Sequence, residues 1–63
     1  MALDTSELSS LADMLEQLTN RFTSMAEESH RQKDDGVAKE LFAVERALFG
    51  AHRRTIRLLN SLR

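Results

Sequence analysis

The 63-residue sequence contains no cysteine, proline, tryptophan or tyrosine, and it has two glycines. Without cysteine the chain has neither a disulfide framework nor a thiolate metal site, a composition that suits a reducing compartment. Without proline, helices on either side of a turn can run uninterrupted. A chain this short buries a small share of its surface, so its stability usually depends on a staple or on a second chain. Because disulfides and thiolate sites are excluded, we expect oligomerisation or binding to a partner protein.

Long apolar runs are also missing from the sequence. No stretch approaches the roughly 18 consecutive apolar residues of a membrane span. The N-terminus has neither the basic start nor the continuous apolar run of a secretory signal. We therefore expect a cytoplasmic protein without a transmembrane segment.

Acidic and basic residues are unevenly distributed, although the formal net charge is only −1. Residues 1–28 carry six acidic residues and one arginine, which gives −5. Residues 29–63 carry eight lysines and arginines and four acidic residues, which gives +4. If the two parts form antiparallel helices, the acidic start lies beside the basic end. Exposed ion pairs contribute about 0–1 kcal/mol each, so we expect this segregation to set orientation more than stability.

The first part of the chain has a helix-start signal followed by an apolar seam. Asp4 is placed to cap a helix, and Glu7 follows three residues later as in a capping box. Large apolar residues then alternate at spacings of three and four, the a/d pattern of a helix that packs on another helix. These residues are Leu8, Leu11, Leu15, Leu18, Phe22 and Met25. The pattern predicts a helix over about residues 5–31.

A turn is predicted at residues 32–36, QKDDG, which is the one cluster of turn-forming residues in the sequence. Asp34 or Asp35 is placed to cap a second helix, and Gly36 has no side chain to restrict its backbone. A connection this short joins antiparallel neighbours. We expect the second helix over about residues 37–62.

The second helix carries its own a/d seam, which consists of Val37, Leu41, Val44, Leu48, Ala51, Thr55, Leu58 and Leu62. Folding the chain about the turn matches the two seams, with opposing residue numbers that sum to 69 or 70. Leu18 then faces Ala51, a large residue against a small one, as interdigitated packing requires. The predicted fold class is all-α, an antiparallel helical hairpin. One long rod that pairs with another chain is the alternative.

A further apolar stripe lies next to the second seam: Phe42, Phe49 and Ile56 recur every seven residues, with Leu59 beside them. Exposed apolar patches of this extent usually mark association surfaces. We expect two hairpins to pair through this stripe, with a two-fold axis near Phe49, as a homodimeric four-helix bundle. The predicted self-association interface comprises Phe42, Glu45, Phe49, His52, Arg53, Ile56 and Leu59. In length and hairpin organisation this dimer is similar to the Rop class of four-helix bundles, a likeness of architecture that implies no function.

The sequence shows no complete catalytic or metal-binding constellation. Glu27 and His30 have the Glu-x-x-His spacing of di-metal bundles, but no second motif of this kind completes the set. The serines have no histidine placed as a base, and there is no glycine-rich phosphate loop. We therefore expect no enzymatic activity, no metal and no cofactor.

The leading hypothesis is a self-associating protein-protein interaction module, such as a small regulator or an accessory subunit of a larger assembly. Two alternatives stay open. The apolar stripe of the second helix suits a different protein or a membrane surface as partner. The basic cluster of Arg53, Arg54, Arg57 and Arg63 suits contacts with anions or nucleic acid, although the sequence pI of about 6.1 is low for a nucleic-acid module.

Overall fold

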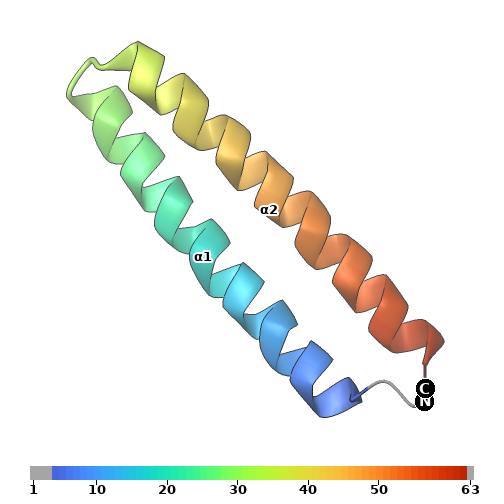
Figure 1. Cartoon of the computed structure of the whole chain (residues 1–63). Coiled ribbons are helices and arrows are strands. Elements are labelled where there is room, and N and C mark those ends of the chain that lie inside the picture. Colours follow the sequence, from blue (N-terminus) through green and yellow to red (C-terminus); the bar gives the residue numbers. More distant parts are fainter. Residues whose placement is uncertain (1–3, 63) are drawn as a thin grey trace.

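The computed structural model describes residues 4–62 as two long antiparallel helices joined by a tight turn (Figure 1). Helix α1 spans Thr5–Arg31 and helix α2 spans Asp35–Ser61. The hairpin measures 49 × 15 × 14 Å, so it is a rod two helices wide. The predicted all-α hairpin is confirmed, and α2 begins two residues earlier than expected.

The start of α1 is held by the predicted cap. The Asp4 carboxylate oxygen Oδ1 accepts hydrogen bonds from the backbone N–H groups of Ser6 and Glu7, at 3.0 and 3.1 Å. These N–H groups have no partner within the helix itself, so the cap satisfies two of the free donors at this end. Glu7 adds a negative charge in the first turn, where the helix dipole favours it.

In the turn between the helices, the residue with the unusual backbone conformation is not the expected glycine. Lys33 has a φ of 62°, in the left-handed region, whereas Gly36 lies within the first turn of α2 and has no positive φ. Asp34 caps α2 through a bond from the Val37 N–H to Oδ1 at 3.4 Å. Because this cap starts the helix at Asp35, the chain reversal is completed before Gly36 and falls on Lys33. Of the two predicted cap residues, Asp34 is the one that caps α2, and the expectation that Gly36 belongs to the turn is wrong.

Small side chains form most of the line along which α1 and α2 touch. Ala12, Ala26 and Ala38 are at most 3% exposed, and Thr19 and Leu59 are 8% and 6% exposed. We call these five residues the contact line. Larger side chains lie beside it and are half-buried: Leu8, Leu15, Phe22, Leu41 and Leu48. Because the distance between packed helix axes depends on the side chains at the contact, the small residues allow a close approach.

In each helix, one of the two rows of the predicted seam does not face the other helix. Leu11, Leu18 and Met25 were expected to face α2, but their side chains are 42–56% exposed. The same holds on α2, where Val37, Val44 and Leu58 are 40–47% exposed. Each helix is therefore rotated about its axis by about 50° from the predicted orientation, which is roughly half the turn between successive residues. The rotation brings the small-residue rows to the contact and moves one large apolar row of each helix to the surface.

Two polar contacts define how far the helices are staggered. The Thr23 hydroxyl lies 2.5 Å from Glu45 Oε2, and His52 Nε2 lies 4.0 Å from Glu16 Oε2. The residue numbers of both pairs sum to 68. The register is thus one residue short of the predicted 69 or 70, so the stagger was predicted closely although the helix rotation was not.

Replacement of a contact-line alanine tests the close approach of the helices. Ala26 is fully buried, so Ala26→Leu inserts a large side chain between the helices. We expect the free energy of unfolding to fall by about 1–3 kcal/mol. Ala43→Leu is the matched control, because Ala43 is exposed on α2, and its effect should stay within about 0.5 kcal/mol. Urea unfolding at one fixed protein concentration measures both, and equal effects would contradict the contact line.

Candidate interaction surfaces

The hairpin has two flanks, one on either side of the contact line, and each carries exposed apolar side chains. On one flank Phe49 shares an open groove with Asn20 and Thr23 of α1. Leu11 and Leu18 belong to the opposite flank of α1, because on a helix their row and the row of Thr23 lie on either side of the buried row of Thr19. The two flanks therefore carry different rows of side chains from α1.

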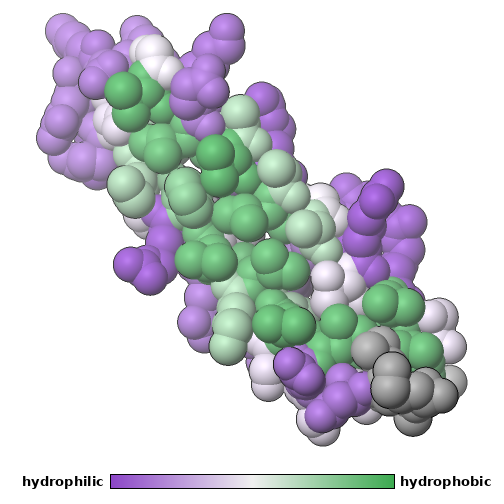
Figure 2. Space-filling model, in the orientation of Figure 1, coloured by the Kyte–Doolittle hydropathy of each residue, from purple (hydrophilic) through white to green (hydrophobic). Residues whose placement is uncertain are grey.

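The flank that carries Leu11 and Leu18 is apolar on both helices, and we call it the broad face. It comprises Leu11, Leu18 and Met25 from α1 together with Val37, Val44 and Leu58 from α2. Figure 2 shows a hydrophobic band that runs over both helices along most of the rod, with hydrophilic side chains at its edges. The half-buried leucines beside the contact line fill the space between the two rows. This surface is continuous, elongated and two helices wide.

The opposite flank contains the Phe49 groove, which has a volume of about 580 Å³. Phe49 is 54% exposed and Ile56 is 37% exposed, whereas Phe42 is half-buried. The α1 side of this groove is polar, with Asn20 and Thr23 lining it. The apolar part of this flank is therefore a stripe on one helix rather than a face shared by two.

Glu45 and His52, both predicted to contact a second copy, face α1 of the same chain instead. The half-buried Glu45 carboxylate is within 2.5 Å of the Thr23 hydroxyl, whose other acceptor is the Thr19 carbonyl at 2.9 Å. The carboxylate is the closer and charged acceptor, so it is the stronger partner for the single hydroxyl proton. The His52 side chain is 24% exposed and lies near Glu16. These contacts tie the middle of α2 to α1.

The remaining residues of the predicted interface divide between interior and surface. Leu59 belongs to the contact line and is 6% exposed, so it already packs within the hairpin. Phe49, Ile56 and Arg53 are exposed on the Phe49 flank. Association through this stripe stays a prediction, and the structure brings fewer of its seven residues to the surface than expected.

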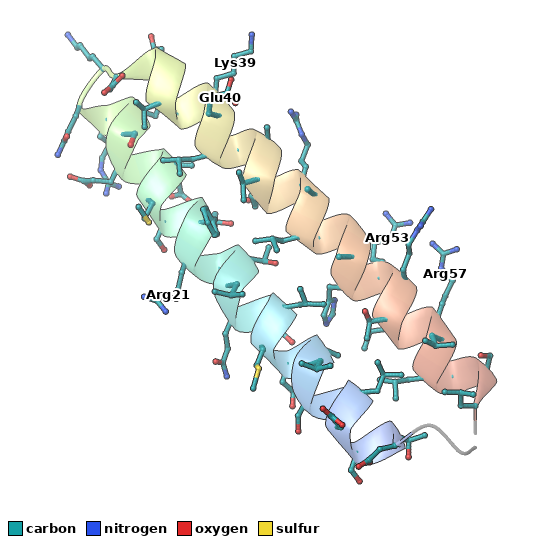
Figure 3. All side chains as sticks on the ribbon, viewed as in Figure 1. Arg21, Lys39, Glu40, Arg53 and Arg57 are labelled. Carbon is teal, nitrogen blue, oxygen red and sulfur yellow. The ribbon has the colours of Figure 1, made fainter. Side chains whose placement is uncertain are left out.

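The arginines of the predicted anion-binding cluster lie on the outer side of α2. Arg53, Arg54 and Arg57 are all exposed, and Figure 3 shows Arg53 and Arg57 pointing away from α1. The Arg53 guanidinium carbon lies 6.0 Å from the centre of the Phe49 ring, at the outer limit of a cation–π contact. Arg63 lies outside the described residues. Anion or nucleic-acid binding by this cluster stays a prediction.

Arg31 and Glu28 form an ion pair in the last turn of α1. The Arg31 side chain donates two hydrogen bonds to Glu28 Oε2, and Gln32 donates one to Oε1 at 3.1 Å. The bond from Arg31 and its positive charge lower the pKa of Glu28 below its usual value. The same contact raises the pKa of Arg31. The Glu28 charge at the rim of the hairpin is thus locally balanced.

Chemical features other than these surfaces are sparse in residues 4–62. No group of three or more His, Asp or Glu side chains in this range is arranged to hold a metal ion. Glu27 and His30 are exposed, and His30 Nδ1 lies 3.4 Å from the Asp35 carboxylate across the turn. Neither described helix combines the length and apolar character needed to cross a membrane.

Comparisons with protein-family models, curated proteins and solved structures found no match to this chain. A functional assignment therefore has to come from the surfaces themselves.

The broad face is the feature that the sequence prediction missed, because its leucines were assigned to the hairpin interior. A signal for it is present in the sequence. Ala12, Thr19 and Ala26 form a row of small residues at heptad spacing, directly beside the rows of large apolar residues. A simple two-helix seam uses two adjacent rows of each helix, whereas α1 has three rows without charged residues. If the small row and the row next to it face α2, the third row is left for another contact.

Removal of the Thr23 hydroxyl tests the polar link between the helices. Thr23→Val keeps the shape of the side chain but leaves the half-buried Glu45 carboxylate without this donor from α1. We expect the free energy of unfolding to fall by about 1–2 kcal/mol in urea unfolding. Thr55→Val is the control, because the half-buried Thr55 hydroxyl bonds only to its own helix, at the Ala51 carbonyl. A loss no larger than that of the control would contradict the proposed link.

Proposed function

We propose that this chain is a non-enzymatic protein-protein interaction module whose partner is a second copy of itself. The observation that carries the proposal is the broad face, where six large apolar side chains from two helices are each 40–56% exposed. Contiguous apolar surfaces of this kind usually mark a binding site on a protein that folds in water.

The small interior of the hairpin supports the need for a partner. Within residues 4–62 the buried apolar side chains are three alanines and Leu59, and no large side chain is fully buried. Burial of apolar area is the main favourable term in folding, and short chains obtain little of it alone. A second chain on the broad face would cover the leucine, valine and methionine side chains that the hairpin leaves half in water.

The dimensions of the broad face match those of a stable interface. The hairpin is 49 Å long and 15 Å wide, so one face has a projected area on the order of 700 Å². Stable protein interfaces bury about 800 Å² on each partner. A dimer that covers most of one side of the rod would therefore bury an area typical of a stable interface.

A second copy is the occupant whose shape and spacing fit this face best. The exposed rows repeat every seven residues on both helices, the spacing by which helices interdigitate side chains in bundles. Two flat helical pairs stacked face to face make a four-helix bundle. In such a bundle the predicted a/d rows meet at the common centre, between copies rather than only within one hairpin.

The Phe49 groove is the weaker candidate for self-association. Its apolar residues come from α2 alone, and Asn20, Thr23 and Arg46 border them. Charged residues are depleted at the centres of protein interfaces, where polar groups are costly to dehydrate. The stripe is nevertheless the natural competitor, so the test compares the two surfaces directly.

A pair of charge insertions separates the two surfaces. Leu18 and Phe49 are 42% and 54% exposed on opposite flanks, so each tolerates glutamate without a buried charge in the isolated hairpin. We expect Leu18→Glu to reduce the mass in solution from dimer to monomer and Phe49→Glu to leave the dimer intact. Light scattering after size exclusion measures the mass, and circular dichroism confirms that both variants stay helical.

The reverse result, with Phe49→Glu monomeric and Leu18→Glu dimeric, would place the interface on the Phe49 stripe. A wild-type chain that is monomeric at high micromolar concentration would overturn self-association altogether.

A further inference from the structure

Resting on the self-association proposed above, we infer that the second copy docks with its turn at the same end of the bundle as the turn of the first. The two-fold axis then runs along the bundle, between the two broad faces. The inference concerns the orientation of the partner, which side-chain size at the middle of the face and the distribution of charge determine together.

Two symmetric arrangements bring the broad faces together with every adjacent helix pair antiparallel. If the two-fold axis runs along the bundle, α1 of one copy lies beside α2 of the other and both turns share one end. If the axis crosses the bundle, α1 lies beside the other α1, α2 lies beside the other α2, and the turns point in opposite directions. Both are closed dimers, so they differ only in which rows and charges meet.

The register of the hairpin is compatible with the arrangement in which α1 meets α2 of the other copy. Residues at the same height along the rod have numbers that sum to 68, as the Thr23 and Glu45 contact shows. An axis along the bundle preserves height, so the same rule holds between copies. The exposed rows obey it within one residue, since Leu11 with Leu58, Leu18 with Ala51, and Met25 with Val44 each sum to 69. The two rows therefore meet without any shift along the rod. An axis across the bundle at the height of Leu18 also avoids a shift, so side-chain size and charge have to distinguish the two arrangements.

Side-chain size favours the axis along the bundle at the middle of the face. With the axis along the bundle, Leu18 of one copy faces the exposed Ala51 of the other. With the axis across the bundle, Leu18 faces Leu18 and Ala51 faces Ala51 at nearly the same height. Interdigitated cores alternate large and small side chains across facing positions, and a pair of alanines opposite each other leaves a gap.

Charge along the helices distinguishes the arrangements further. Residues 4–16, at the start of α1, carry four acidic side chains and no basic one. Residues 52–62 lie at the same height on α2 and carry three arginines and no acidic residue. With both turns at one end, each acidic start lies between two arginine-bearing ends, one from its own chain and one from the other copy. With the turns at opposite ends, its inter-copy neighbour is the end of α1, where Arg21 and Arg31 balance Glu27 and Glu28, so the attraction to a second basic end is lost.

These charges act on orientation through the summed field rather than through single ion pairs. Exposed pairs contribute little each, and salt screens them beyond about 10 Å. Complementary fields nevertheless select among docked arrangements that bury the same apolar area. Because both orientations bury the same broad face, a modest electrostatic difference is enough to decide between them.

A single spin label near the turn tests the orientation. The chain has no native cysteine, so Gln32→Cys gives one labelling site, and it removes only an exposed hydrogen bond to Glu28. Gln32 belongs to the same row as Met25, at the turn end of the broad face. If both turns share one end, pulsed EPR should give a separation on the order of 20 Å, since packed helix axes lie about 10 Å apart. If the turns are at opposite ends, the separation should be about 40 Å, from 1.5 Å per residue on either side of the centre.

A label at mid-length separates failure of the orientation from failure of self-association. Gln17→Cys lies near the middle of α1, so the two labels lie at nearly the same height and their separation stays at about 30 Å or less in either orientation. A dipolar signal at Gln17 with about 40 Å at Gln32 would overturn the inferred orientation and leave self-association standing. No dipolar signal at either site would overturn both.

Discussion

The close packing of small side chains between α1 and α2 is the constraint on which the rest of the structure depends. Ala12, Thr19 and Ala26 present little volume to the second helix, so the helix axes can approach closely. Apart from Leu59, the large side chains lie on either flank of the contact line instead. The hairpin therefore closes while burying few large residues, and rows of leucine and valine that look like interior in the sequence remain 40–47% exposed.

This packing separates the contact that fixes geometry from the contact that supplies hydrophobic area. Within one chain, the caps at Asp4 and Asp34 set the helix limits, and the Thr23 and Glu45 contact sets the stagger. These interactions are specific but each is worth only about 1 kcal/mol. The broad face offers far more apolar area but no polar contact that would select a partner. A hairpin with a defined register and an uncovered apolar face is suited to pairing with another helical surface of the same period.

Local signals in the sequence were enough to predict both helices and the turn approximately, because caps and heptad spacing depend on neighbouring residues. Matching the two seams gave nearly the observed register. Rotation of the helices was not predictable in the same way. A heptad pattern identifies which rows are apolar, but it does not say whether a row is covered by its own hairpin or by another chain. The a/d assignment of Leu11, Leu18 and Met25 selected the larger row, whereas the structure places the alanine row at the contact. Similarly, the role of Thr23 was missed because hydroxyl residues in helices usually face solvent, and its partner Glu45 is 22 residues away.

The same reasoning explains why orientation depends on charge rather than on apolar burial. Two broad faces bury the same surface whichever way the turns point, so hydrophobic area alone gives two nearly equal dimers. Side-chain size and charge break that equality, since Leu18 faces Ala51 in one arrangement only, and since the start of α1 is acidic and the end of α2 is basic at the same height. The asymmetry orders the helices within one hairpin and acts a second time between copies, because each α1 then borders two α2 helices. A pattern that contributes little to the stability of one hairpin therefore has its main effect on how two of them assemble.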